Sequence, residues 1–181
     1  ALDSVNQRLG QLRSVTWTVS DNTLSTGGHY NGATQVDAAI AATQSASMYG
    51  GVVYLRRGNY TNVFANGSMT VNGVTLRGET YDVTLTLGAT NTYANTLPVV
   101  MENVALQRSA AYVLTLAGDV RMQNVRANPG MLKLGTTSTA NVRLDRLVMV
   151  AAGVSAATTY GISFEGKTVH ATNCDFVGPD T

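Results

Sequence analysis

The sequence predicts an all-β fold, a right-handed parallel β-helix with three strands per rung and about five rungs. Three observations support this. A pattern of two short apolar runs, separated by two polar or small residues, occurs five times. The interruption holds a residue type that suits a tight corner, and a further short apolar run precedes each copy. The copies begin at residues 69, 99, 120, 142 and 169, so the spacings are 30, 21, 22 and 27 residues. A unit repeated at this distance is typical of solenoids.

Within each copy the apolar side chains alternate with period two, as in a strand that buries one face. The two-residue interruption resets this alternation, so the chain turns a corner and keeps the same face inward. The five apolar sets are Met69-Val71-Val74-Leu76, Val99-Met101-Val104-Leu106, Val120-Met122-Val125-Ala127, Val142-Leu144-Leu147-Met149 and Val169-Ala171-Cys174-Phe176.

The second residue of each corner is Gly73, Asn103, Asn124, Arg146 or Asn173. Glycine and asparagine accept a positive φ more readily than other residues, so four of the five corners suit a left-handed bend. Arginine does not share this preference. The sequence therefore predicts a modified corner at Arg146.

A third short strand is expected before each apolar pair, followed within three residues by a glycine. An all-β sandwich of hairpins is the alternative, but Asn-Gly hairpin turns are scarce in this chain. The expected third strands are Val53–Leu55, Leu85–Leu87, Leu114–Leu116, Leu132–Leu134 and Ile162–Phe164.

Residues 1–15 form a separate N-terminal helix in this prediction. Leu2, Val5, Leu9 and Leu12 are spaced 3, 4 and 3 residues apart, as in the seam of a coiled coil two heptads long. A helix this short is marginally stable alone and needs a packing partner. We expect a trimeric coiled coil that joins identical chains. The alternative is a helix folded back onto the solenoid.

Residues 16–50 are expected to hold an extended lead-in and a capping helix, which starts after an N-cap at Thr34 and runs to about Met48. Such a helix covers the open core at the end of a solenoid. Residues 51–181 then form the β-helix. No second capping pattern follows the last strand, so we expect another chain to cover that end or the parent chain to continue.

Two stretches carry a resemblance to a known family. Residues 38–60 contain Ala-Ala-Ile-Ala-Ala, Gly-Gly-Val-Val-Tyr-Leu and Gly-Asn-Tyr, and residues 71–78 read Val-Asn-Gly-Val-Thr-Leu-Arg-Gly. Together they resemble the entry and the first full rung of the pectate-lyase-like β-helix of bacteriophage tailspikes and tail fibres. The resemblance implies a homotrimer on a virion. It implies either cleavage of surface polysaccharide or a structural and receptor-binding role.

Composition narrows the functional classes. The formal net charge is +1 and only 13% of the residues are charged, which gives no support for binding to nucleic acid. No apolar run is long enough to span a membrane, so we expect a soluble protein without membrane insertion. The single cysteine excludes a disulfide within one chain. No ligand spacing for a metal is present, and no cofactor is expected.

Hydrolysis of a glycoside requires two carboxyl groups about 5 Å or about 6.5–9.5 Å apart. Glu102 and Asp145 form the best candidate pair, because both take the first corner position of their copies. They are two rungs apart, or roughly 9.6 Å at the usual strand spacing. Solvated carboxylates at two corners are therefore the simpler interpretation, and catalysis stays an open alternative.

Arginine is the most distinctive outward residue. Arg121 and Arg143 take equivalent outward positions on neighbouring copies, and His170 takes the next. Guanidinium groups bind carboxylates and phosphates, so an anionic glycan could lie across the two arginines. They could equally pair with acids of a neighbouring subunit or remain solvated.

Taken together, the sequence predicts a structural virion protein, a trimeric segment of a phage tail fibre or tailspike that takes part in host attachment. Expected partners are two further copies of the chain, other tail or head proteins of the virion, and host surface polysaccharide. A polysaccharide-degrading tailspike enzyme and a head fibre that binds glycan without cutting it remain as alternatives.

Overall fold

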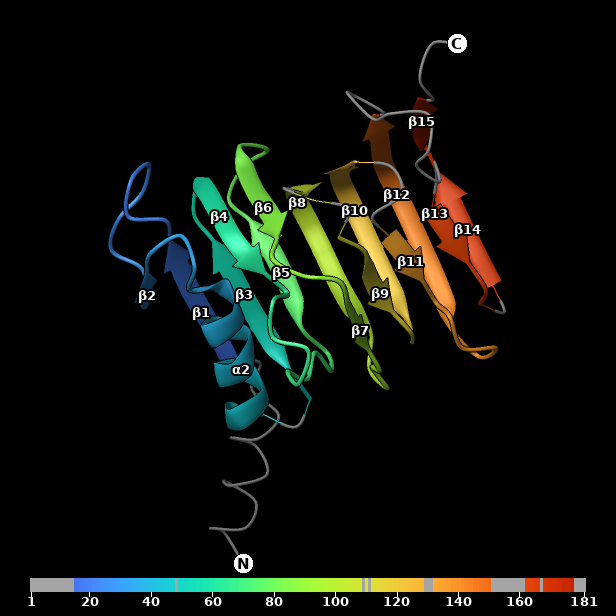
Figure 1. Cartoon of the computed structure of the whole chain (residues 1–181), viewed down its shortest axis with the longest axis horizontal. Coiled ribbons are helices and arrows are strands. Elements are labelled where there is room, and N and C mark those ends of the chain that lie inside the picture. Colours follow the sequence, from blue (N-terminus) through green and yellow to red (C-terminus); the bar gives the residue numbers. More distant parts are fainter. Residues whose placement is uncertain are drawn as a thin grey trace, which may run out of the picture.

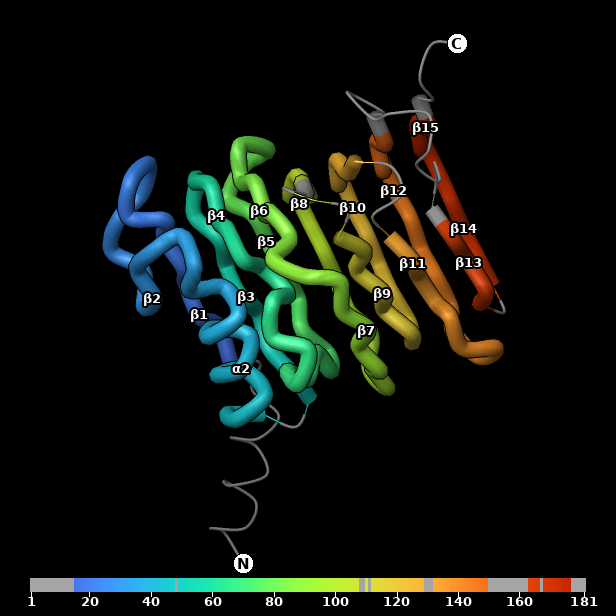
Figure 2. Tube along the Cα trace, in the orientation of Figure 1, coloured from blue at the N-terminus to red at the C-terminus, as the bar shows by residue number. Residues whose placement is uncertain are grey.

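The computed structural model describes residues 15–47, 49–108, 110, 112–128, 132–150, 162–166 and 168–177. Its strands form a right-handed parallel β-helix with three strands per rung, as predicted. All pairings between the described strands are parallel. Successive rungs lie side by side along the solenoid axis, from blue to red in Figures 1 and 2.

The solenoid has three faces. An 11-stranded sheet bends at the corners and supplies the first two, and a four-stranded sheet supplies the third. Face 1 contains β1 (Val15–Ser20), β3 (Gly51–Leu55), β5 (Thr75–Gly78), the first halves of β8 (Val99–Arg108), β10 (Val120–Ala127) and β12 (Asn141–Val150), and β14 (Thr168–Thr172). Face 2 contains β4 (Gly58–Val63), β6 (Val83–Leu87), the second halves of β8, β10 and β12, and β15 (Asp175–Val177). Face 3 contains β7 (Asn91–Tyr93), β9 (Leu114–Leu116), β11 (Leu132–Leu134) and β13 (Ile162–Phe164).

The predicted register holds for four of the five copies. Val99, Val120, Val142 and Val169 are Cα partners in sequence order across β8, β10, β12 and β14. The first three of these valines are fully buried, and Val169 on the last strand of face 1 is 40% exposed. Each apolar position thus packs on its equivalent in the next rung, and the core runs continuously along the axis.

The alignment of the first copy is wrong by half a rung. Leu76 pairs with Met101 in face 1, whereas the repeat pattern places it beside Leu106. The partner of Leu106 is Leu85 in face 2. The physical reason is the turn at residues 79–82, which replaces the one-residue corner of the later rungs and lengthens this rung.

The same shift corrects two of the expected third strands. Residues 114–116, 132–134 and 162–164 do form face 3, as β9, β11 and β13. Residues 53–55 belong to β3 in face 1, and residues 85–87 belong to β6 in face 2. The large sheet also extends to Val15, ahead of the predicted solenoid boundary at residue 51, because β1 pairs with β3.

All five expected corner residues adopt a positive φ, including Arg146. Its φ of 54° lies beside the 55° of Asn103, 58° of Asn124 and 53° of Asn173, so the prediction of a modified corner at Arg146 is wrong. The stacked rungs on either side impose the bend on whichever residue occupies it. The Nδ2 of Asn124 donates to the Oδ1 of Asn103 at 2.7 Å, which begins an asparagine ladder that Arg146 interrupts.

Replacing Arg146 with Asn is therefore expected to stabilise the protein by about 0.5 kcal/mol, because asparagine tolerates the left-handed conformation and an amide can join the ladder. The exposed ion pair of Arg146 with Asp145 contributes little to offset this gain. Urea unfolding of Arg146→Asn measures the effect. Arg146→Lys is the matched control, which keeps the charge and should give no gain. Equal stability of wild type and Arg146→Asn would contradict the role assigned to the ladder.

Helix α2 (Val36–Ala46) packs at the end of the solenoid where β1 begins the sheet (Figure 1). It contacts β1 and β3 and buries Val36, Ala39, Ile40 and Thr43. The expected N-cap at Thr34 is wrong by one residue, since Gln35 holds that position without a side-chain hydrogen bond. Beyond β1, the short strand β2 (Tyr30–Asn31) completes this end of the sheet. The predicted seam of Leu2, Val5, Leu9 and Leu12 lies outside the described residues.

Candidate functional site

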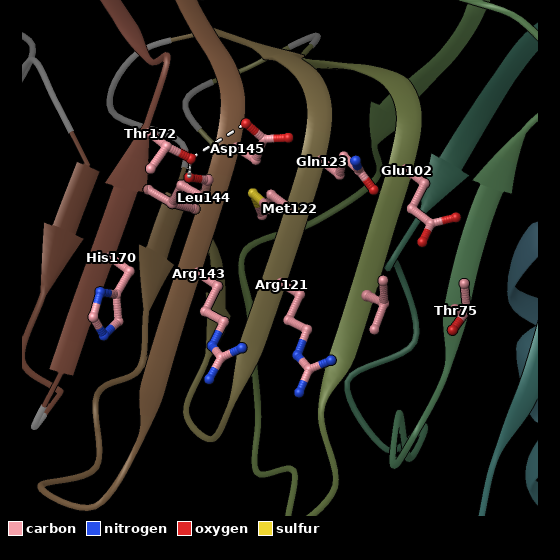
Figure 3. Close-up of a pocket in the computed structure, with 11 residues that line it drawn as sticks. Thr75, Glu102, Arg121, Met122, Gln123, Arg143, Leu144, Asp145, His170 and Thr172 are labelled. Atoms are coloured by element: carbon pink, nitrogen blue, oxygen red, sulfur yellow. Dashed lines mark hydrogen bonds between the residues drawn. The ribbon is translucent and has the colours of Figure 1, made fainter.

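An open groove runs across the outside of face 1 and encloses about 680 Å³ (Figure 3). Strands β5, β8, β10, β12 and β14 carry it, so it crosses five consecutive rungs, roughly 19 Å at a strand spacing of about 4.8 Å. We call this the face 1 groove. The outward side chains that line it are Thr75, Val100, Glu102, Arg121, Gln123, Arg143, Asp145, His170 and Thr172.

One row of the face 1 groove is basic. Arg121 is the Cα partner of Arg143, and Arg143 is the Cα partner of His170. All three side chains are exposed, and Figure 3 shows them side by side on one level of the sheet. The structure thus brings together the three basic residues that the sequence placed at equivalent outward positions.

The second row of the face 1 groove is polar and acidic. Glu102, Gln123, Asp145 and Thr172 follow one another as Cα partners, two residues further along their strands than the basic row. Arg77 on β5 takes the position before Glu102. The Nε of Arg77 lies 2.5 Å from Oε2 of Glu102, and this hydrogen bond and the negative charge raise the pKa of Arg77.

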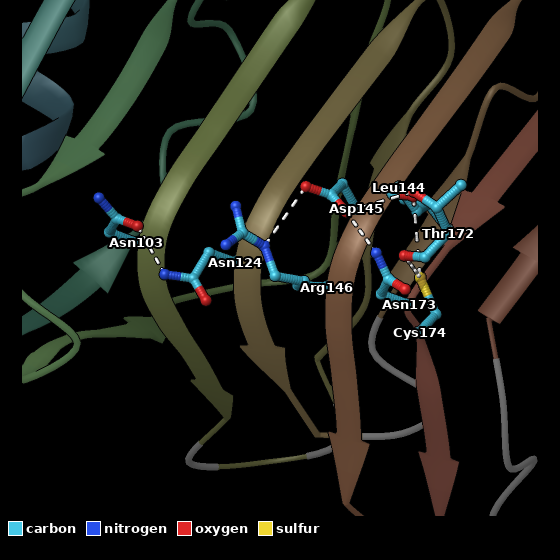
Figure 4. A network of polar contacts seen from close by, with 8 residues as sticks. All are labelled: Asn103, Asn124, Leu144, Asp145, Arg146, Thr172, Asn173 and Cys174. Atoms are coloured by element: carbon cyan, nitrogen blue, oxygen red, sulfur yellow. Dashed lines mark hydrogen bonds and ion pairs between the residues drawn. The ribbon is translucent and has the colours of Figure 1, made fainter.

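Asp145 also has a basic partner. Its Oδ2 lies 3.3 Å from Nε of Arg146, and its Oδ1 accepts hydrogen bonds from Oγ1 of Thr172 at 3.2 Å and Nδ2 of Asn173 at 3.5 Å (Figure 4). The two hydrogen bonds cross from β12 to the last rung, whereas the ion pair lies within β12. Asp145 therefore ties the corner of one rung to the next.

The placement of Glu102 and Asp145 does not favour a hydrolytic pair. They lie in one column with Gln123 between them, as predicted, and two strand spacings separate them by roughly 9.6 Å. This backbone spacing lies at the upper limit of the range of about 6.5–9.5 Å for inverting enzymes. Each carboxylate is also held in an ion pair by its own arginine, Glu102 by Arg77 and Asp145 by Arg146.

Sequence reasoning missed Arg77 as the partner of Glu102. The half-rung error in the first copy assigned Arg77 to face 2. In the described strands Arg77 is the only basic residue that is a Cα partner of Glu102. The lengthened spacing of 30 residues between the first two copies was the available signal. An inserted turn was needed to explain it.

A second groove of about 930 Å³ lies along face 2 and its corner. Arg57, Arg126 and Arg146 line it together with Tyr81, which is 71% exposed. Arg57 pairs with Asp82 at 3.3 Å across the inserted turn. The lining of this second groove is mixed. Ala105 and Val148 lie on either side of Arg126, so the groove has no continuous charged row.

Within the described residues, no three His, Cys, Asp or Glu side chains gather as ligands of a metal ion. His29 lies at the other end of the solenoid from His170. Its ring packs edge-on against Trp17, with 5.5 Å between ring centroids, and its Nδ1 accepts a hydrogen bond from the backbone N–H of Thr18 at 3.1 Å. This histidine therefore has a packing role.

Comparison with protein-family models, curated proteins and solved structures finds no significant match to this chain. In the part of the chain that the structure describes, no helix combines the length and apolarity needed to cross a bilayer. Functional conclusions therefore depend on the geometry of the two grooves and on the solenoid itself.

Proposed function

We propose that this chain is a structural segment of a trimeric virion protein, a bacteriophage tail fibre or tailspike that takes part in attachment to the host cell. The observation that carries the proposal is the continuous core. The columns headed by Val99 and Met101 are buried from rung to rung without a polar interruption through β12. Such nearest-neighbour packing makes a solenoid a stiff spacer.

The trimer in this proposal rests on the sequence of residues 2–12. Leu2, Val5, Leu9 and Leu12 supply the a and d positions of two heptads. A helix as short as the predicted one needs a partner to be stable. Three identical helices would meet that need and would hold three solenoids in parallel.

A polysaccharide-degrading enzyme is the less supported alternative. The described acids offer Glu102 and Asp145 as their best pair, and each of these is engaged by an arginine. Binding of glycan without cleavage, as in a non-catalytic head fibre, is favoured by the basic row of the face 1 groove.

The trimer is tested by the mass of the full chain in solution. Leu9→Asp places a charge in the predicted seam and is expected to convert a species of three chains into single chains. Gln7→Asp is the matched control, since residue 7 takes the f position furthest from the seam and should leave the mass unchanged. Light scattering at low micromolar concentration measures all three proteins.

A single-chain mass for the wild type would overturn the trimer. An unchanged mass for Leu9→Asp would show that residues 2–12 do not hold the chains together. Circular dichroism of each variant establishes that the β-helix is intact, so a change in mass can be assigned to assembly.

A further inference from the structure

Arg121 and Arg143 form a pair of like charges on neighbouring strands. They are direct Cα partners, and both side chains are exposed on the same side of face 1. Like charges opposite one another destabilise a sheet. The ion pairs formed among the described residues are Arg57–Asp82, Arg77–Glu102 and Arg146–Asp145, and none of them involves Arg121 or Arg143. An anion bound between the two guanidinium groups would relieve this repulsion.

The acidic row restricts which anion fits. Glu102 and Asp145 flank Gln123 two residues along the strands from the arginines, and Figure 3 shows both rows facing the same groove. A polyphosphate is charged along its whole length and has no hydroxyl groups along it to donate to these carboxylates. A ligand with carboxylates on one side and hydroxyl groups on the other would match both rows, because hydroxyl groups donate to carboxylate and amide oxygens.

Faces 2 and 3 of a second copy offer no row of acids in the described strands. The central outward positions of face 2 are Asn59, Thr84, Ala105, Arg126, Val148 and Asp175, with a single acid on the last strand. The exposed central positions of face 3 are Thr92, Lys133 and Ser163. Neither of these two faces therefore supplies a row of carboxylates that matches Arg121 and Arg143.

We propose that the face 1 groove binds an acidic polysaccharide whose carboxylates are held by Arg121 and Arg143. The sugar chain lies along the solenoid axis, because the groove crosses five rungs in that direction. Its hydroxyl groups donate to Glu102 and Asp145, and the amide of Gln123 supplies a further donor and acceptor. This inference rests on the proposed attachment function and names the class of ligand that the attachment site takes.

Isothermal titration calorimetry with the full chain tests the proposal, with tetragalacturonate as the probe. We expect binding that weakens with added salt, since the contacts are charge-assisted and exposed. Arg121→Gln/Arg143→Gln should weaken it about tenfold or more. Arg126→Gln is the matched control, because Arg126 lies on the same strand but faces outward on face 2, and its affinity should equal that of the wild type.

Two further probes separate the ligand classes. The methyl ester of tetragalacturonate keeps the hydroxyl groups and loses the charges, so it should bind more weakly than the acid. Inorganic polyphosphate should also bind more weakly, because of the acidic row. Tighter binding of polyphosphate, equal affinity of the double variant, or no binding of tetragalacturonate at millimolar concentration would overturn the proposal.

The result is independent of the trimer test. Arg121 and Arg143 lie on neighbouring strands of the same chain, so tetragalacturonate should bind the Leu9→Asp variant as well. If the wild type has the mass of one chain and binds tetragalacturonate, the trimer proposal is wrong and the binding proposal stands. If the wild type is a trimer that does not bind tetragalacturonate, the trimer proposal stands and the binding proposal is wrong.

Discussion

Replacement of Asp21 with Asn is expected to lower the free energy of unfolding by about 2–4 kcal/mol, because it disrupts a buried set of charge-assisted hydrogen bonds. Asp21 is 2% exposed and follows β1. Its carboxylate accepts from the backbone N–H of Thr23 at 3.0 Å, Leu24 at 2.9 Å, Ser25 at 3.1 Å and Asn59 at 3.1 Å. The hydroxyl of Thr23 also donates to it at 2.7 Å. The side-chain amide of asparagine would place an N–H donor where an oxygen of Asp21 now accepts hydrogen bonds.

The same contacts set the pH dependence. Burial alone raises the pKa of Asp21, but the hydrogen bonds from the Thr23 side chain and from the backbone of Thr23, Asn59 and Ser25 outweigh burial and hold the pKa well below its ordinary value. The folded protein therefore binds this proton more weakly than the unfolded chain does. The stabilisation is present above the ordinary carboxyl pKa of about 4 and is lost as the pH falls through the folded-state pKa.

Urea unfolding at pH 7 and at a series of acidic pH values measures both effects. Asp21→Asn should be less stable at pH 7 and should lose less stability on acidification than the wild type. Asp82→Asn is the control, since that carboxylate is exposed and forms a surface pair with Arg57 worth at most about 1 kcal/mol. Equal destabilisation by the two variants would contradict the role given to Asp21.

Gly118→Ala should destabilise the protein by about 3 kcal/mol or more, because a Cβ at this position would overlap the backbone carbonyl oxygen of Asn95 in the preceding rung. The backbone cannot move away easily. The N–H of Gly118 donates to Oδ1 of Asn95 at 2.8 Å, while Nδ2 of Asn95 donates to the carbonyls of Leu97 at 3.0 Å and Asp119 at 2.9 Å. This buried amide fixes the corner that joins face 3 to face 1.

Thermal and urea unfolding of purified Gly118→Ala give the size of the effect. Gly67→Ala serves as the control, because its new Cβ would meet only the side chain of Asn91, whose Oδ1 at 2.7 Å has to shift, and the residue is exposed, so the loss should be smaller. If Gly118→Ala fails to fold, Asn95→Ala tests the same corner by removing the amide alone, and we expect a smaller loss than for Gly118→Ala. Wild-type stability in both variants would contradict the account of this corner.

The fold could be predicted from the sequence where one residue makes the corner. The rungs of β8, β10 and β12 have a single residue with positive φ between two alternating runs, so the repeat of apolar positions gives both the strands and their register. The prediction failed where residues 79–82 replace that single residue. Gly73 has the φ of 65° expected of a corner. However, it lies against the backbone of Tyr49, which precedes β3, so Gly73 takes the turn that leads into face 1 and not the corner between faces 1 and 2.

The basic row of the candidate site followed from the same register, since Arg121, Arg143 and His170 are equivalent in the repeat. The partners of the acids did not. Arg77 was shifted out of its column by the error in the first copy, and the contacts of Asp21 join the turn after β1 to Asn59 on the next rung. Contacts of this kind depend on which turn lies above which, and the alternation of apolar residues carries no information about turns.

Bending a rod of this kind has to stretch the hydrogen bonds on one side and compress those on the other. In the rungs of β8, β10 and β12, three sheet faces surround the core and resist bending in every direction. Among the described residues, the rungs of β1 and β3 have no strand on the third face, and α2 packs there against β1 and β3 through side chains. We therefore expect the solenoid to bend more easily at its α2 end than along the rungs of β8, β10 and β12.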